Sequence, residues 1–144
     1  MKGALTGGAY PRPMLTVDVV VIAGAGKAQR VLLIQRAGPP FAGSWALPGG
    51  FVEEGERVAD AAPRELAEET GLQVGVVELL GVYDTPGRDP RGWTVSVVYR
   101  ARISSETTVA GADDAREARW FALDSLPELA FDHALILADA FGGC

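Results

Sequence analysis

The stretch that most constrains this chain runs from residue 50 to 72 and reads GFVEEGERVADAAPRELAEETGL. If its second half is helical, Glu65, Glu68 and Glu69 stand at positions i, i+3 and i+4 and share one face. Such carboxylates repel one another by roughly 0.2–0.5 kcal/mol per exposed pair, whereas a hard divalent cation makes the same arrangement favourable. Gly71 is expected to end the helix. The stretch therefore predicts an acidic helix face that is either solvated or binds a metal ion.

The spacing of the fixed residues separates these two interpretations. A tight loop is expected at Leu47-Pro48-Gly49-Gly50. From the last of these glycines the pattern is five residues, a glutamate, seven residues, Arg-Glu, an aliphatic residue, any residue, Glu-Glu, any residue, a glycine and an aliphatic residue. This pattern resembles the signature box of the Nudix hydrolases, with every fixed position filled. Periodicity alone indicates only an amphipathic acidic helix after a glycine loop.

The resemblance covers nearly the full chain from about Leu15 and implies the fold class and the cofactor. The fold is a mixed αβ Nudix fold, a mixed β-sheet sandwiched between helices, with the catalytic loop-helix-loop at 50–72. The cofactor is Mg²⁺, with Mn²⁺ as a substitute. The implied ligands are the helix carboxylates and one backbone carbonyl, namely Glu65, Glu68, Glu69 and Gly49. Glu56 and Arg64 are expected to support them, Arg64 by holding Glu56 and orienting a metal-binding glutamate.

The chemistry that the resemblance implies is cleavage of a nucleoside diphosphate linked to another group. The diphosphate repels an attacking water, and Mg²⁺ neutralises charge and lowers the pKa of bound water. The general base has two interpretations, because some family members use a box glutamate and others use a carboxylate from a downstream loop. Here that loop is residues 110–115, where Asp114 is the first candidate and Asp113 the second. A turn or a solvated acidic pair is the ordinary alternative.

Substrate specificity is expected to come from outside the box. Pro86 lies fifteen residues after Gly71, and a proline near this position is typical of the ADP-ribose pyrophosphatase group. An ordinary turn proline is the alternative. Further stretches make the chain resemble the short prokaryotic ADP-ribose pyrophosphatases, at residues 36–40, 45–53, 89–92 and 130–133.

Three loop arginines are candidates for binding a phosphate or a ribose: Arg36, Arg88 and Arg91. Solvated loop side chains are the alternative for each of them. The only histidine, His133, favours a surface or packing role at the start of a helix over catalysis.

Three functions follow from the resemblance. The first is Mg²⁺-dependent hydrolysis of ADP-ribose to AMP and ribose 5-phosphate. The second is hydrolysis of a nucleoside triphosphate or another nucleotide sugar. The third, of a different class, is a non-catalytic Nudix domain that senses ADP-ribose. Such sensors carry an added DNA-binding region and usually a degraded box, whereas this box is intact.

The composition and the net charge limit the binding partners that can be expected. The 144 residues, of which 48% are hydrophobic, predict a single domain at 1–144 with an N-terminal arm at 1–13. A formal charge of −6 argues against a nucleic-acid polymer or an anionic membrane as the main partner, but a metal ion still permits a small nucleotide. No signal peptide or membrane-spanning run is evident, and Cys144 is the sole cysteine, so a cytoplasmic location is expected. The resemblance implies a homodimer.

The hydrophobic pattern predicts the remaining elements. Strands are expected at 15–22, 30–35, 93–103 and 117–123, the first covered on both faces, and one strand or a pair of strands at 73–83. In the strand at 93–103, Trp93, Val95, Val97, Tyr99 and Ala101 should face inward. A capped helical turn is expected at 124–129, and a last helix at 131–141, whose inward side is Leu135, Leu137, Ala138 and Phe141.

Pro63 interrupts the box helix in the sequence. Because proline lacks a backbone N–H and clashes with the preceding turn, the helix is expected either to start late, with Asp60 as N-cap, or to kink. Both alternatives leave the turn from Glu65 to Glu69 intact.

Overall fold

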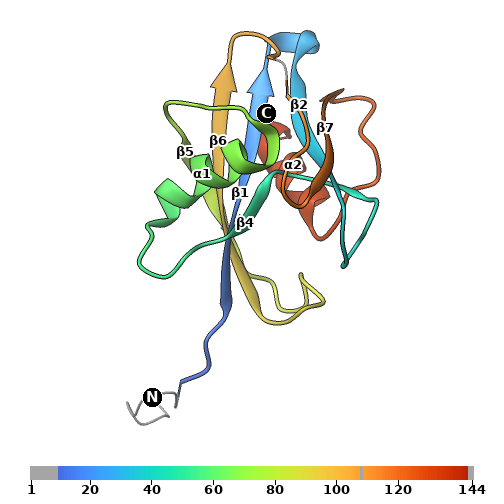
Figure 1. The fold of residues 1–144 in the computed structure, drawn as a ribbon. Coiled ribbons are helices and arrows are strands. Elements are labelled where there is room, and N and C mark those ends of the chain that lie inside the picture. Colours follow the sequence, from blue (N-terminus) through green and yellow to red (C-terminus); the bar gives the residue numbers. More distant parts are fainter. Residues whose placement is uncertain (1–9, 108, 143–144) are drawn as a thin grey trace.

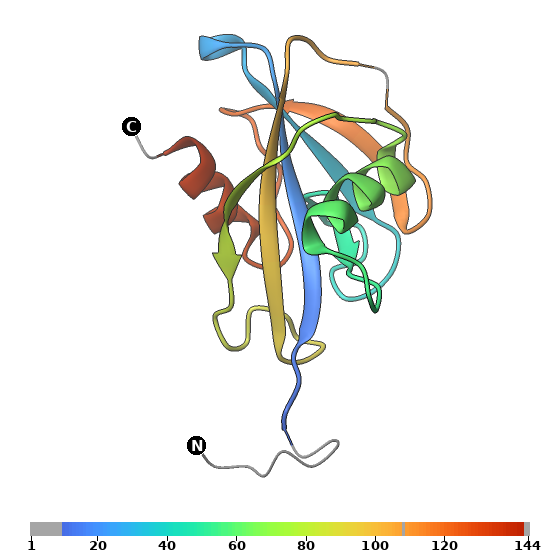
Figure 2. The ribbon, with the colours of Figure 1, turned by 90° about the vertical axis from the view of Figure 1, so that its left-hand side faces the viewer.

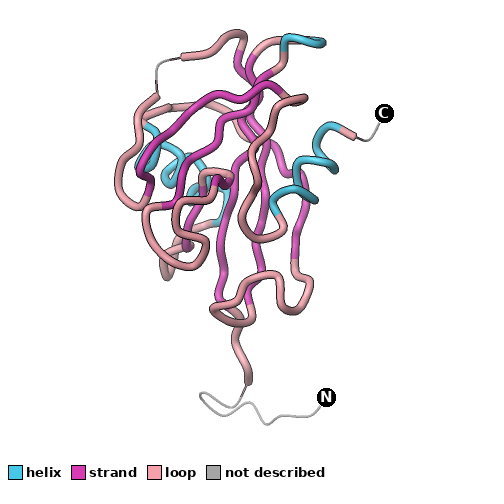
Figure 3. The backbone as a smooth tube through the Cα atoms, turned by 90° about the vertical axis from the view of Figure 1, so that its right-hand side faces the viewer, coloured by secondary structure: helices cyan, strands magenta, loops and turns pink. Residues whose placement is uncertain are grey.

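The computed structural model describes residues 10–107 and 109–142, so most of the predicted N-terminal arm lies outside the described residues. A seven-stranded mixed sheet lies between two α-helices, as predicted (Figure 1). The views from the two sides place the helices on opposite faces of the sheet (Figures 2 and 3). The elements in chain order are β1 Met14–Ala23, η1 Gly26–Ala28, β2 Arg30–Arg36, β3 Trp45–Ala46, β4 Gly49–Phe51, α1 Val58–Thr70, β5 Glu78–Tyr83, β6 Thr94–Ile103, β7 Ala115–Ala122 and α2 His133–Phe141.

The centre of the sheet is the parallel pair β1 and β6, which runs in register from Met14 opposite Thr94 to Ala23 opposite Ile103. Successive side chains of β1 point to opposite faces, so the valine-rich sequence supplies two cores. Val17, Val19 and Val21 pack in the core beneath α1, which also contains Ala61, Ala62 and Leu66. Val20 and Ile22 pack in the core beneath α2, which also contains Ile136 and Leu137. The prediction of a first strand covered on both faces is confirmed.

The strands β1 and β2 pair only at their joined ends, through Ile22 with Val31 and Ala23 with Arg30. Farther along they diverge, and two short strands continue the hydrogen bonding. β4 pairs with β1 at residues 16–18, and β3 pairs with β2 at residues 34–35. The opening between β1 and β2 is therefore lined by backbone from the glycine loop.

Helix α1 begins at Val58, with Arg57 as a cap that makes no side-chain hydrogen bond. The predicted late start with Asp60 as N-cap is therefore wrong, and Pro63 lies inside the helix. Because Pro63 has no N–H, the carbonyl four residues earlier loses its usual donor, while burial of Leu66 holds the helix to the sheet. Gly71 ends the helix as predicted, with φ of 77° and its N–H donating to the carbonyl of Ala67 at 2.9 Å.

The predicted inward face of the strand at 93–103 is wrong at its beginning. Thr94 and Ser96 are buried, whereas Trp93 is half exposed. These hydroxyls are tolerated inside because each has a partner: Thr94 donates to the carbonyl of Gly92 and Ser96 donates to Asp18. A central strand is covered on both faces, so alternation does not identify its inner side.

Three other predictions need correction. Helix α2 turns His133, Ile136 and Leu137 inward and leaves Leu135 and Ala138, both predicted to face inward, exposed, because packing against the sheet rather than the apolar pattern sets its inner face. Residues 124–129 form no helical turn; a turn over residues 122–125, closed by the N–H of Ser125 on the carbonyl of Ala122, leads into an irregular segment. The strand expected over 73–83 forms only from Glu78, with Gly75 and a bend before it.

Among the described residues, no helix is long and apolar enough to cross a membrane.

Candidate active site

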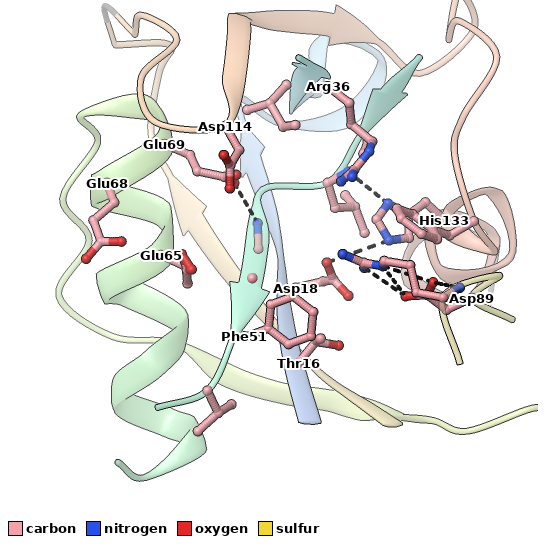
Figure 4. Close-up of a pocket in the computed structure, with 18 of the residues that line it drawn as sticks. Thr16, Asp18, Arg36, Phe51, Glu65, Glu68, Glu69, Asp89, Asp114 and His133 are labelled. Atoms are coloured by element: carbon pink, nitrogen blue, oxygen red, sulfur yellow. Dashed lines mark hydrogen bonds and ion pairs between the residues drawn. The ribbon is translucent and has the colours of Figure 1, made fainter. Parts of the chain in front are cut away.

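A cavity of about 460 Å³ opens where β1 and β2 diverge. It is bounded by α1 on one side, β4 in the middle and the loop before α2 on the other (Figure 4). Nine of the predicted site residues line it: Arg36, Gly49, Arg64, Glu65, Glu68, Glu69, Arg88, Arg91 and Asp114. Glu56 and Pro86 are outside the lining.

The acidic face of α1 lies against the glycine loop at two places. The N–H of Gly49 donates to the carboxylate of Glu69 at 2.9 Å. A methyl group at Gly50 would overlap the carboxylate of Glu65, so a glycine is required for this close approach. The loop therefore fixes these two carboxylates at the wall of the cavity.

Burial changes the acidity of both carboxyls. It raises the pKa of Glu65 to about 7, with the charges of Glu68, Asp113 and Asp114 adding to the effect. It raises the pKa of Glu69 to about 8, against the opposing hydrogen bond from Gly49. In the metal-free chain Glu69 therefore tends to keep its proton at neutral pH and Glu65 titrates there, and a cation would displace these protons.

Arg64 supports the acidic face from the solvent side, in the way that the resemblance implies. Its guanidinium donates to both oxygens of Glu56, at 2.6 and 2.9 Å. This hydrogen bond lowers the pKa of Glu56 to about 2. The same guanidinium donates to both oxygens of Glu68 at 3.2 Å, lies 3.7 Å from Glu65 and caps the carbonyl of Phe51. Arg64 thus links the helix to the glycine loop.

The side chain of Glu68 points toward Arg64 and solvent rather than toward Glu69 (Figure 4). Within residues 10–107 and 109–142, no three Asp, Glu, His or Cys side chains are grouped closely enough to hold an ion. The donor set nevertheless fits Mg²⁺, since the buried carboxyl of Glu69 and the partly buried carboxyl of Glu65, both with raised pKa values and hard oxygen atoms, lie beside a glycine backbone. The ligand assignment stays a prediction, and it requires Glu68 to turn away from Arg64.

The downstream acidic loop approaches the same wall. Asp114 lines the cavity beside Glu69 (Figure 4). Asp113 is not part of the lining and takes a left-handed backbone with φ of 53°, which Asp tolerates better than most residues. The N–H of Ala112 donates to the carbonyl of Glu69 at 3.0 Å, which ties this loop to the end of α1. Of the two candidates, the structure brings Asp114 to the cavity.

The opposite end of the cavity is cationic and aromatic. The guanidinium of Arg91 lies 5.1 Å from the ring centre of Phe51 and 5.5 Å from that of Phe131. Arg36 lies 5.0 Å from the centre of Phe131 and donates to the carbonyl of Pro40. Burial and the charge of Arg91 lower the pKa of Arg36. The anion beside Arg91 is the buried carboxylate of Asp89, 2.8 Å away.

Arg88 and Pro86 occupy structural positions in the 84–92 loop. The side chain of Arg88 is 4% exposed and holds Asp132 through hydrogen bonds of 2.6 and 2.9 Å. Pro86 and Gly87, whose φ is 84°, form a turn closed by the N–H of Arg88 on the carbonyl of Thr85 at 3.1 Å. This is the residue order of a type II turn. Pro86 thus directs Arg88 inward without lining the cavity.

Sequence reasoning missed four buried polar residues that line the cavity: Thr16, Asp18, Asp89 and His133. His133 lies at the start of a helix as expected, but it is buried rather than at the surface, and it lines the cavity. Asp18 gave one signal in the sequence, because it is a lone acid within a run of valines.

Comparisons with known proteins agree on one family. The NUDIX domain model matches residues 12–140. The chain is 48% identical over 130 residues to the ADP-ribose pyrophosphatase of Methanocaldococcus jannaschii, covering 90% of this chain and 74% of the relative. It is 36% identical over 136 residues to the ADPR responsive transcriptional repressor NtrR of Acinetobacter baylyi, covering 92% of this chain and 54% of the repressor, so it spans about half the length of that protein.

A solved structure agrees as well. The NUDIX domain of Shewanella oneidensis NrtR complexed with ADP ribose superposes with a TM-score of 0.86 at 34% identity, covering 94% of this chain and 90% of that one. The family match spans most of the chain, and the box is intact. The chain therefore belongs to the NUDIX family and is a Nudix hydrolase.

Proposed function

We propose that this Nudix hydrolase is an Mg²⁺-dependent pyrophosphohydrolase that converts ADP-ribose to AMP and ribose 5-phosphate. The observation that carries the proposal is that an acidic helix face and a cationic, aromatic end open onto one cavity. A nucleoside diphosphate sugar carries a charged diphosphate next to a ribose and an aromatic base, which complements these two ends. The similarity to an ADP-ribose pyrophosphatase over 90% of the chain supports this substrate.

The reaction adds water across a phosphoric anhydride: the water oxygen bonds to one phosphorus and the bridging P–O bond breaks. Glu65, Glu68, Glu69 and the carbonyl of Gly49 are the residues that would hold the metal. When bound, Mg²⁺ supplies charge neutralisation and activation of water. Arg64 holds Glu56 by hydrogen bonds and lies 3.7 Å from Glu65, so it supports the acidic face from the solvent side while Glu68 turns away from it.

Two roles remain for side chains on the cavity wall. Asp114 is the candidate proton acceptor for the attacking water, because it faces the cavity beside Glu69 without serving as a ligand in this assignment. Arg36 and Arg91 are assigned to the substrate, since both lie over Phe131 at the end opposite α1. Arg88 and Pro86 are assigned to shaping the loop, which supports binding indirectly.

A second candidate is ADP-ribose sensing without cleavage. It is favoured by the similarity to the ADPR responsive repressor and by the NrtR domain complexed with ADP ribose. We place it second because all the box residues are retained. The net charge of −6 supports a small nucleotide as the main partner rather than a nucleic-acid polymer. We further propose a cytoplasmic homodimer.

The test is AMP release from a panel of nucleotides with Mg²⁺, comparing wild type with Glu68→Gln. We expect ADP-ribose to be cleaved best and the variant to lose at least about 100-fold in rate, because a metal-binding charge is removed. Glu54→Gln is the matched control, because Glu54 is an exposed glutamate in the loop before α1 and lies outside the cavity. This variant should keep the wild-type rate.

Two other results would each support a different function. Preferred cleavage of triphosphates would retain the active-site assignment and reject ADP-ribose. Binding of ADP-ribose without release of AMP by the wild-type chain would replace hydrolysis with sensing.

A further inference from the structure

Among the buried polar side chains that line the cavity, Asp18 and His133 lie side by side on its floor and have no part in the proposed hydrolysis. Asp18 comes from β1 and is 8% exposed, and His133 comes from the first turn of α2 and is 3% exposed. Both line the cavity. Burying such groups costs free energy unless they form hydrogen bonds. The hydrogen bonds that they already make therefore determine which donor and acceptor remain for a ligand.

The carboxylate of Asp18 is fixed from behind. The hydroxyl of Ser96, on the neighbouring strand β6, donates to its Oδ2. Gly49 packs so closely against Asp18 that a methyl group there would overlap its Oδ1. One carboxylate oxygen is therefore occupied, and the other lies beside the glycine whose N–H holds Glu69.

The imidazole of His133 is also held in one tautomer. The N–H of Leu47 donates to Nδ1 at 3.0 Å, so Nδ1 is an acceptor and the proton of the neutral ring is on Nε2. Burial lowers the pKa of His133, which keeps the ring neutral. Nε2 lies 3.6 Å from Oδ1 of Asp18, beyond a good hydrogen bond.

The floor thus presents an acceptor and a donor side by side. A hydroxyl group complements both, because it donates one hydrogen bond and accepts another. A phosphate oxygen would instead be repelled by the carboxylate of Asp18. The chemistry of the pair therefore selects an alcohol.

The position of the pair agrees with this selection. In Figure 4, Asp18 lies between Glu65 and Glu69 on one side and His133 on the other. His133 is in contact with Phe131 of the cationic, aromatic end, with ring centres 5.4 Å apart. Along a nucleotide the sugar lies between the phosphates and the base. A nucleotide with its diphosphate at α1 and its base at Phe131 would place its sugar over Asp18.

We infer that Asp18 and His133 bind a sugar hydroxyl of the nucleotide substrate and set its preference for a ribose over a deoxyribose. The inference rests on the proposed function for the identity of the nucleotide. ADP-ribose carries a ribose on each side of its diphosphate, and the experiment distinguishes the two.

The experiment is calorimetric binding of ADP-ribose and of analogues that each lack one hydroxyl, on the adenosine ribose or on the distal ribose. Ca²⁺ is the divalent ion, and product analysis of each sample shows whether the ligand stayed intact. The variants are Asp18→Ala, which removes the acceptor, and His133→Asn, which removes the Nε2 donor while its amide oxygen accepts the N–H of Leu47. Asp124→Asn, an exposed carboxylate outside the cavity, is the control.

We expect the wild-type chain to bind one deoxy analogue roughly 10- to 150-fold more weakly than ADP-ribose, as for hydrogen bonds to charged groups. In either variant this ratio should fall to within about threefold, and in the control it should stay at the wild-type value. The ratio compares two ligands on one protein, so a loss of folded protein does not change it.

The analogue that shows the ratio identifies which ribose is bound. Equal binding of all deoxy analogues by the wild-type chain would overturn this inference and leave the proposed hydrolysis standing. Discrimination without cleavage in Mg²⁺ would reject hydrolysis and retain the inference. A chain that binds none of these ligands would contradict both.

Discussion

At the scale of single residues, the site depends on contacts that admit no larger side chain. Gly50 faces the carboxylate of Glu65, and Gly49 faces Asp18 and the backbone of β1. The glycine loop therefore sets the distance between α1 and the sheet. Its glycines matter for close approach rather than for an unusual backbone, because neither has a positive φ.

Gly50→Ala tests this contact. The added methyl group would displace the carboxylate of Glu65, so we expect the rate of AMP release to fall at least about 10-fold while the chain stays folded. Gly75→Ala is the matched control, because a methyl group there meets nothing within 4 Å. An unchanged rate in Gly50→Ala would show that Glu65 does not need its present position.

The contacts that could be predicted are those between residues close together in the chain. The family resemblance implied that Arg64 holds Glu56 and orients a glutamate of the helix, and Arg64 donates to Glu56 and Glu68 within one segment. Asp18 and His133 were not predicted as site residues because they become neighbours only when β1 meets α2. Arg88 was expected to face a ligand, but its ion pair with Asp132 depends on a contact across the fold.

At the scale of elements, helix α1 forms although it contains an interior proline. It continues through Pro63, which withholds one hydrogen bond from the carbonyl of Ala59. The sequence left a late start and a kink open, whereas the helix begins at Val58, which packs against the core beneath α1. The same limit applies to α2, whose inner face follows from packing rather than from the apolar count.

Pro63→Ala should restore the missing donor. We expect the free energy of unfolding to rise by about 1 kcal/mol, since the regained hydrogen bond exceeds the loss of rigidity in the unfolded chain. The rate of AMP release should stay within about twofold, because Glu65 to Glu69 lie beyond the proline. Urea unfolding measures the first quantity, and a decrease in stability would show that Pro63 favours the native backbone.

At the scale of the whole molecule, the acidic face costs stability as the pH rises. The folded pKa values of Glu65 and Glu69, about 7 and about 8, exceed their ordinary value of 4.5. The unfolded chain therefore loses these protons first, and the metal-free fold becomes less stable as the pH rises from 4.5 to about 8. At the proposed metal site, Mg²⁺ would compete with the same protons.

The increase in Tm on adding saturating Mg²⁺ should therefore grow with pH. Between pH 6 and pH 8.5 we expect this increase to grow by at least about 4 °C, which corresponds to roughly 1–2 kcal/mol. Calorimetric melting at both pH values measures it. In Glu69→Gln, which has no proton to lose, most of the pH dependence should disappear; a wild-type dependence in this variant would assign the effect to other groups.

The parallel pairing of β1 with β6 has a consequence for how the chain reaches its structure. Met14 pairs with Thr94, so the valine-rich first strand leaves the ribosome long before its central neighbour has been made. Both cores contain residues from β1, and neither core closes until β6 arrives. Pairing between strands so far apart in the sequence slows folding. Until β6 has been made, the apolar side chains of β1 remain accessible to other chains. The strand that carries Asp18 into the cavity is therefore the segment that most needs protection during synthesis.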